Sequence, residues 1–125
     1  MSYILIVEDT VSNAQLLRNI LEAQGYQVQC AYNGADGLAQ ARQACPDLII
    51  IDLRLSGSSL SGWDLIQRLR EDDVCRRVPI IVAAVEAHPL DRVRAFEAGC
   101  DRYLTKPFKV QQLRDAVAEL VGLPG

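Results

Sequence analysis

The chain has 125 residues, of which 50% are hydrophobic and 23% are charged, and its formal net charge at pH 7 is -3. This length and balance are typical of one globular domain, so we expect a single domain over residues 1–125. The negative charge argues against a general nucleic-acid surface, which needs a broad basic stripe, and no apolar run approaches the ~20 residues that span a bilayer. We therefore expect neither nucleic-acid nor membrane partners.

The hydrophobic pattern alternates between strands and helices along the chain. Continuous or alternating apolar runs predict five strands, over residues 3–7, 27–31, 48–51, 78–85 and 102–105. Helical spacing of apolar residues predicts a helix after each strand. The first has Ser12 as its N-cap, the fourth carries Phe96 on a face that we expect in the core, and the last stops at Gly122.

Five alternating strand–helix units indicate an α/β fold. Strands as continuously apolar as 48–51 need helices on both faces of their sheet. Right-handed crossovers restrict the topology, and the flavodoxin-like order 2-1-3-4-5 is the natural one for five strands. We therefore expect a doubly wound, five-stranded parallel sheet with five helices.

The four cysteines are far apart and never form a C-x-x-C pair, which gives no support for zinc or thioredoxin-like chemistry. The even number of cysteines would allow two disulfides. However, the chain has neither a signal peptide nor the loop-rich character of a disulfide-stabilised scaffold. We therefore expect small buried thiols in a reducing cytoplasm, at Cys30, Cys45, Cys75 and Cys100.

Charged residues stand where three of the expected strands end. Glu8 and Asp9 follow the first strand, Asp52 follows the third, and Lys106 follows the fifth. In an open parallel sheet the ligand site lies outside the carboxyl ends of the strands, so these charges should share one pocket. Three carboxylates repel one another unless a proton or a cation joins them, and at neutral pH we expect a cation. Mg²⁺ suits carboxylates, waters and a phosphate oxygen. Asp52 is then the best nucleophile toward phosphorus, with Lys106 neutralising the transferred oxygens.

These residues carry a family resemblance. The set Val7-Glu8-Asp9, Asp52 and Lys106-Pro107-Phe108, with Tyr103 three positions before the lysine, resembles the receiver domain of two-component response regulators over essentially the whole chain. The stretches Leu21-Glu22-Ala23-Gln24-Gly25-Tyr26, Glu71-Asp72-Asp73 and Gly99-Cys100 are similar to stand-alone receivers of the cell-cycle-regulator type.

The resemblance implies that Asp52 accepts phosphate from a histidine kinase or a histidine phosphotransfer protein. Magnesium would be held by Asp9, Asp52 and the backbone carbonyl of Arg54, with Glu8 reached directly or through water. Lys106 would contact the phosphoryl group, aimed by a cis bond to the following proline.

The resemblance also describes what kind of protein to expect. Such a domain assists its own magnesium-dependent phosphorylation and dephosphorylation and is not a turnover enzyme. A downstream protein partner would contact the face made by the fourth helix, the fifth strand and the fifth helix, where Tyr103 lies.

The chain departs from the family at the switch position. Ala84 stands where such receivers carry Ser or Thr, and no Ser or Thr occurs between Ser61 and Thr105. In the family that hydroxyl binds the phosphoryl oxygen and lets the aromatic residue of the fifth strand rotate, so the hydroxyl that would act together with Tyr103 is absent here. Losing one charge-assisted hydrogen bond, roughly 1.5–3 kcal/mol, should weaken the switch without abolishing it.

The loop after Asp52 also differs. Gly62 lies ten residues beyond the acceptor, where the family usually has eight, and one hydroxyl of the stretch Ser56-Gly57-Ser58-Ser59-Leu60-Ser61 is a candidate replacement for the missing one. Arg54 is either a solvated side chain or a partner of the phosphoryl group or a resting carboxylate.

Two functions therefore stay open: a phosphate-dependent response regulator, and a pseudo-receiver that binds partners without phosphorylation. An enzyme or cofactor carrier fits less well. Glu8 and Asp9 would repel a flavin phosphate, and phosphatases of the aspartyl-phosphate type need an Asp where this chain has Arg54.

Overall fold

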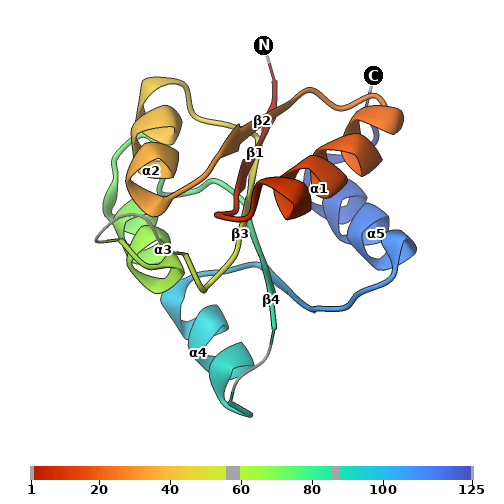
Figure 1. Cartoon of the computed structure of the whole chain (residues 1–125). Coiled ribbons are helices and arrows are strands. Elements are labelled where there is room, and N and C mark those ends of the chain that lie inside the picture. The colour runs from red at the N-terminus through yellow and green to blue at the C-terminus, as the bar shows by residue number, and fades with distance from the viewer. Residues whose placement is uncertain (1, 56–59, 86–87, 125) are drawn as a thin grey trace.

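The computed structural model describes residues 2–55, 60–85 and 88–124, which form a central sheet covered by helices on both faces (Figure 1). The strands are β1 (Ile4–Val7), β2 (Val28–Ala31), β3 (Leu48–Ile51), β4 (Ile80–Ala84) and β5 (Arg102–Thr105). The helices are α1 (Val11–Ala23), α2 (Gly34–Gln43), α3 (Gly62–Glu71), α4 (Asp91–Ala98) and α5 (Val110–Val121).

All neighbouring strands are parallel, and their order is β2-β1-β3-β4-β5. The predicted doubly wound, flavodoxin-like order is thus confirmed. The fully buried strands β1 and β3 lie inside the sheet, whereas β2 lies at an edge, as its alternating sequence indicates. In this register Val7 pairs with Ile51, so β1 and β3 end side by side.

Alternate residues of each strand face different helix layers. Leu5 and Val7 of β1 pack in the layer of α2, α3 and α4, whereas Ile4 and Ile6 pack in the layer of α1 and α5 (Figure 1). Each buried aliphatic side chain stabilises the fold by roughly 1.5–3 kcal/mol. A register slip of one residue would exchange the two layers, so the core fixes where every strand ends.

One arginine ties together elements that are distant in sequence. Arg70, in the last turn of α3, donates to the carbonyl oxygens of Val78 at 2.6 Å, Arg76 at 3.1 Å and Gly99 at 2.7 Å. It also pairs with Asp101 Oδ2 at 3.1 Å. The planar guanidinium can satisfy several acceptors in this way, so it joins α3 to the segments that enter β4 and β5.

Three local predictions are wrong. Ser12 lies inside α1, whose N-cap is Thr10 and has no side-chain capping bond. Phe96 is 42% exposed, because α4 buries only the small residue Ala95. Cys45 is exposed, because it follows the end of α2 and lies in the connection to β3 rather than on the buried face of the helix.

None of the four cysteines forms a disulfide in the structure, and the other three differ in burial. Cys75 and Cys100 are buried, as expected, whereas Cys30 is half-buried. Among the described residues, no helix combines the length and the apolar character that crossing a membrane requires.

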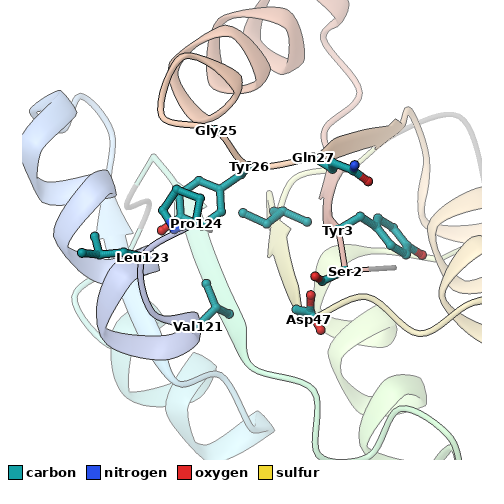
Figure 2. A pocket seen from close by; sticks show the side chains of 10 residues that line it. Ser2, Tyr3, Gly25, Tyr26, Gln27, Asp47, Val121, Leu123 and Pro124 are labelled. Carbon is teal, nitrogen blue, oxygen red and sulfur yellow. The ribbon is translucent and has the colours of Figure 1, made fainter.

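A pocket of about 410 Å³ lies at the amino ends of the strands, where the chain termini also meet the sheet (Figure 2). Tyr3, Tyr26 and Pro124 are among its lining residues, and the Tyr26 hydroxyl donates to the carbonyl oxygen of Gly122 at 2.8 Å. This is the end of the sheet opposite to Glu8, Asp9 and Asp52, so the pocket is not part of their site.

Candidate functional site

The charged residues are positioned by the backbone ladder, which continues one residue beyond three strands. The N–H of Glu8 donates to Ala31 O at 3.0 Å, that of Asp52 to Val7 O at 3.1 Å, and that of Lys106 to Ala84 O at 2.9 Å. Main-chain bonds thus hold the Cα atoms of these residues in the sheet. Their side chains project from the carboxyl ends of β1, β3 and β5.

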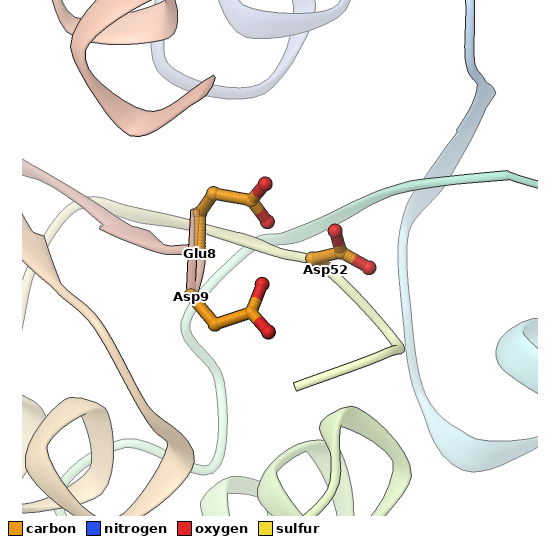
Figure 3. A group of neighbouring side chains, drawn as sticks. All are labelled: Glu8, Asp9 and Asp52. Atoms are coloured by element: carbon orange, nitrogen blue, oxygen red, sulfur yellow. The ribbon is translucent and has the colours of Figure 1, made fainter. Parts of the chain in front are cut away.

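Three carboxylates meet at this edge (Figure 3). One oxygen from each of Glu8, Asp9 and Asp52 lies within 4.8 Å of the others. Glu8 is only 2% exposed, while the two aspartates are half-buried. The predicted convergence of these residues is observed.

Lys106 completes the cluster. Its Nζ lies 3.1 Å from Asp52 Oδ2 and 3.5 Å from Glu8 Oε1, so one ammonium contacts two carboxylates. The Lys106–Pro107 peptide bond is cis, as the resemblance implied.

Two further donors hold the carboxylates. The backbone N–H of Arg54 donates to Asp52 Oδ1 at 2.9 Å, and Asn13 Nδ2 donates to Glu8 Oε1 at 2.9 Å. The Arg54 side chain itself is exposed. Sequence reasoning did not single out Asn13, since its contact depends on the phase of α1, which begins at Val11.

The two central carboxyls differ in proton affinity. Burial raises the pKa of Glu8 to about 7, with a hydrogen bond to Asp52 as the next cause. The pKa of Asp52 is lowered: burial opposes this shift, but hydrogen bonds from Glu8 and the Arg54 N–H, together with Lys106, outweigh it. Without a metal ion the arrangement therefore favours a proton on Glu8 and a negative charge on Asp52.

The donor set fits a hard divalent cation. Oε2 of Glu8 is buried and, among the described residues, has no hydrogen-bond donor. This unpaired Glu8 oxygen lies beside two half-buried aspartates, which is energetically unfavourable. Either a proton or a cation would stabilise the arrangement. Carboxylate oxygens without histidine or cysteine are suited to Mg²⁺ rather than to zinc.

The position at which the family resemblance predicts a switch hydroxyl is apolar. Ala84 is 1% exposed and ends β4, and Tyr103 of β5 is 4% exposed in the same core layer. The guanidinium of Arg92, on α4, lies 5.7 Å from the centroid of the Tyr103 ring. The aromatic residue is thus buried in this structure although position 84 has no hydroxyl.

The segment after Asp52 returns to the sheet at Gly62. A Cβ on Gly62 would lie 2.5 Å from both Asp52 O and Leu53 Cα, so only glycine fits, and its N–H donates to Leu53 O at 3.2 Å. Next to it, the Trp63 ring is covered by Arg94 of α4 at 4.1 Å. Gly62 therefore makes a close approach to the acceptor strand despite the longer loop. Among the candidate replacement hydroxyls, those at residues 56–59 lie outside the described residues, and the Ser61 hydroxyl caps α3 by accepting from the Asp64 N–H at 3.1 Å.

The chain matches the family model for the response regulator receiver domain over residues 4–118. It is 34% identical over 119 residues to the polar-differentiation response regulator DivK of Brucella anthropi, and the match covers 95% of each chain.

Solved structures agree with this match. The receiver domain of the sensor histidine kinase PA1611 from Pseudomonas aeruginosa, with a magnesium ion in its active-site cleft, has a TM-score of 0.87 and 32% identity, covering 97% of this chain and 98% of that one. The chemotaxis response regulator CheY4 of Vibrio cholerae has a TM-score of 0.86 and 27% identity, covering 96% and 98%.

Proposed function

Because the chain belongs to the family of response regulator receiver domains, we propose that it accepts a phosphoryl group on Asp52 and passes the resulting change to a partner protein. Receiver domains are signalling modules rather than turnover enzymes, phosphorylation of an aspartate is typical of them, and they bind Mg²⁺ at an acidic site. The proposal covers residues 1–125 as one receiver domain.

The observation that carries the proposal is the contact of Lys106 with Asp52, at 3.1 Å, beside two further carboxylates. Asp52 stays ionised because its pKa is lowered, so its carboxylate is available as a nucleophile at neutral pH. Lys106 is already within reach of the oxygens that a transferred phosphoryl group would bring.

The residues that would hold the metal ion are Asp9, Asp52 and the carbonyl of Arg54, with Glu8 directly or through water. When bound, Mg²⁺ would supply charge neutralisation for the phosphoryl oxygens. Glu8 would release its proton as the ion binds, since its pKa of about 7 lies close to neutral pH. Asn13 would keep the Glu8 carboxylate oriented.

Transfer would begin with a phosphohistidine on a histidine kinase or a phosphotransfer protein. A carboxylate oxygen of Asp52 attacks phosphorus, an O–P bond forms, and the P–N bond to the imidazole breaks. Lys106 neutralises charge on the phosphoryl group.

The face formed by α4, β5 and α5 is the proposed surface for a downstream protein. Four large apolar side chains on or next to this face are exposed. Val93 and Phe96 belong to α4, Val110 begins α5, and Leu90 directly precedes α4. Tyr103 and Arg92 lie between α4 and β5, so a change at the acceptor end of β4 and β5 has a short route to this face.

The test is incubation with acetyl phosphate and Mg²⁺, followed by intact-mass measurement and phosphate-affinity electrophoresis. We expect a single phosphate on the wild type and none on Asp52→Asn. Omitting Mg²⁺ or adding EDTA should remove the modification. If the wild type stays unmodified with this donor and also with a competent kinase, the phosphoacceptor proposal fails.

The second candidate is a pseudo-receiver whose partner contacts do not depend on phosphate. Ala84 favours it, because the hydroxyl that links phosphate to the aromatic residue is missing. Equal binding of a partner by the wild type and Asp52→Asn, before and after phosphorylation, would support this candidate.

A further inference from the structure

The pocket at the amino ends of the strands takes no part in the proposed phosphoacceptor function. Its volume of about 410 Å³ lies within the range of roughly 300–1,000 Å³ that is usual for small-molecule sites. A second hollow of about 430 Å³ adjoins it, because both are lined by Tyr3, Gly25, Tyr26 and Gln27. This end of the molecule therefore has room for a small ligand.

The two sides of the pocket differ in chemistry (Figure 2). Tyr26, Pro124 and Val121 lie on one side and present mainly apolar atoms, whereas Asp47 lies on the other. Asp47 is the only ionised side chain among the described residues that line this pocket. It is exposed, and its carboxylate forms no hydrogen bond or ion pair with the part of the chain that the structure describes. A ligand that suits both sides would have an apolar body and a positively charged end.

Two helices end at the same pocket. α1 ends at Ala23 and α5 ends at Val121, and the lining includes Gly25, just after α1, and Leu123, just after α5. The carbonyl groups at a helix C-terminus carry partial negative charge, which Lys or Arg in the last turn often offsets. Neither helix has a basic residue in its last turn. Both helix ends thus add to the negative potential of the carboxylate.

Contacts between distant segments hold the walls of the pocket in place. The Tyr26 hydroxyl donates to Gly122 O at 2.8 Å, which joins the ends of α1 and α5 although 96 positions separate the two residues. The N–H of Asp47 donates to Tyr3 O at 2.9 Å, which fixes the backbone on the polar side. Because the walls are already formed, a ligand would not have to order them.

We propose that this pocket binds a small organic ammonium ion with an apolar body, such as the protonated form of an arylalkylamine. The ammonium group would pair with the Asp47 carboxylate, and the apolar body would lie against Tyr26 and Val121. The site is at the other end of the sheet from Glu8 and Asp52, so the proposal is independent of phosphorylation.

Other classes of ligand fit the same lining less well. An anion would be repelled by Asp47 and by both helix ends. A divalent metal ion would need several oxygen ligands, whereas the described lining has one carboxylate. A wholly apolar molecule would take water away from the Asp47 carboxylate without replacing the lost hydrogen bonds.

The experiment titrates the isotope-labelled full chain with phenethylammonium at about pH 7, where the amine is protonated, and follows backbone amides by NMR. We expect saturable shifts at Gly25, Gln27 and Asp47, with a Kd on the order of 1 mM. Hydrocinnamate has the same phenylethyl body with a carboxylate end, and it should cause no saturable shift at these residues. Equal binding of the two probes, no saturation up to about 20 mM phenethylammonium, or shifts confined to Glu8 and Asp52 would overturn the proposal.

Three variants test the role of charge. Asp47→Asn keeps the backbone bond to Tyr3 and should raise the Kd for phenethylammonium about fivefold, the upper end for an exposed ion pair. Asp73→Asn, at an exposed aspartate outside the lining, is the matched control and should leave the Kd unchanged. Leu123→Lys adds a cation at an 83% exposed position of the lining, so it should weaken phenethylammonium binding and allow hydrocinnamate to bind.

An unchanged Kd in Asp47→Asn, or equal losses in Asp47→Asn and Asp73→Asn, would contradict the proposed ion pair. The comparison of the two probes on the wild type decides the question even if a variant fails to fold.

Discussion

The guanidinium of Arg92 lies over two aromatic rings, 5.7 Å from the centroid of Tyr103 and 5.9 Å from that of Phe96. Tyr103 is buried at β5, whereas Phe96 is exposed on α4. One cation therefore joins the buried Tyr103 of β5 to the exposed Phe96 of α4, and both elements belong to the proposed partner face.

Removing that cation should loosen Tyr103. An exposed cation–π contact contributes about 0.5–1 kcal/mol, so Arg92→Ala should lower the free energy of unfolding by that amount and raise the mobility of the Tyr103 ring. Urea unfolding and NMR of the tyrosine rings measure the two effects. Arg77→Ala, at another exposed arginine, is the control and should change stability by less than about 0.5 kcal/mol. Equal losses in both variants would contradict a specific role for Arg92.

Restoring a hydroxyl at position 84 should strengthen the response to phosphate. Ala84→Thr provides a donor that can reach a phosphoryl oxygen, a bond of roughly 1.5–3 kcal/mol, or about 10- to 150-fold in the switching equilibrium. Trp63 lies beside the acceptor loop, so its fluorescence before and after acetyl phosphate is the measurement. Ala84→Val adds nearly the same volume without a hydroxyl and is the matched control. Indistinguishable responses of the two variants would show that the missing hydroxyl does not limit this switch.

The metal-free protein should lose stability as pH rises from about 4.5 to about 7. The folded pKa of Glu8 is about 7, against an ordinary value of 4.5, so the folded state holds this proton more tightly and the unfolded state releases it first. The difference between these two pKa values corresponds to a free energy of unfolding of roughly 3–4 kcal/mol. The lowered pKa of Asp52 acts in the other direction but only below about pH 4, outside this window.

Urea unfolding in EDTA between pH 5 and 8 measures the Glu8 effect. Glu8→Gln removes the titrating group, so its stability should vary less over the same range. In the wild type, Mg²⁺ and the proton compete for Glu8, so magnesium affinity should rise with pH until about pH 7. A magnesium affinity that does not change between pH 5.5 and 7.5 would be incompatible with this competition.

Gly62→Ala should damage both stability and the acceptor site. The new Cβ would lie 2.5 Å from the Asp52 carbonyl oxygen and from Leu53 Cα, so the backbone must move, at a cost of at least ~1–3 kcal/mol. Phosphorylation by acetyl phosphate should slow because the displaced atoms adjoin the acceptor. Gly122→Ala is the comparison: φ is +78° there, but no atom lies within 4 Å of the added Cβ, so only the conformational cost of roughly 1 kcal/mol applies. A smaller loss for Gly62→Ala than for Gly122→Ala would argue against the clash.

Sequence reasoning predicted the strand order and the convergence of Glu8, Asp9, Asp52 and Lys106 because both follow from topology. Continuous apolar strands require a doubly covered parallel sheet, and in such a sheet the strand ends meet at one edge. The spacing of residues along the chain was enough to predict the strand order and this convergence, because neither depends on how individual side chains pack.

The contacts that sequence did not reveal depend on packing between distant segments. Arg70 reaches Gly99 and Asp101, about thirty residues away, and nothing in the local pattern near Arg70 distinguishes it from a solvated arginine. The exposure of Phe96 has a similar cause: helical spacing locates a face, but the neighbouring elements decide whether a large or a small residue fills the contact.

The main-chain bonds that hold Glu8, Asp52 and Lys106 to their neighbouring strands bear on how such a chain can diverge over generations. Because these bonds use atoms that every residue possesses, substitutions on the outer faces of the helices leave the charged groups where they are. Substitutions on α4 or α5 can thus change the proposed partner face while the proposed acceptor site keeps its geometry. Related chains can therefore differ in their partner proteins while they keep the same acceptor site.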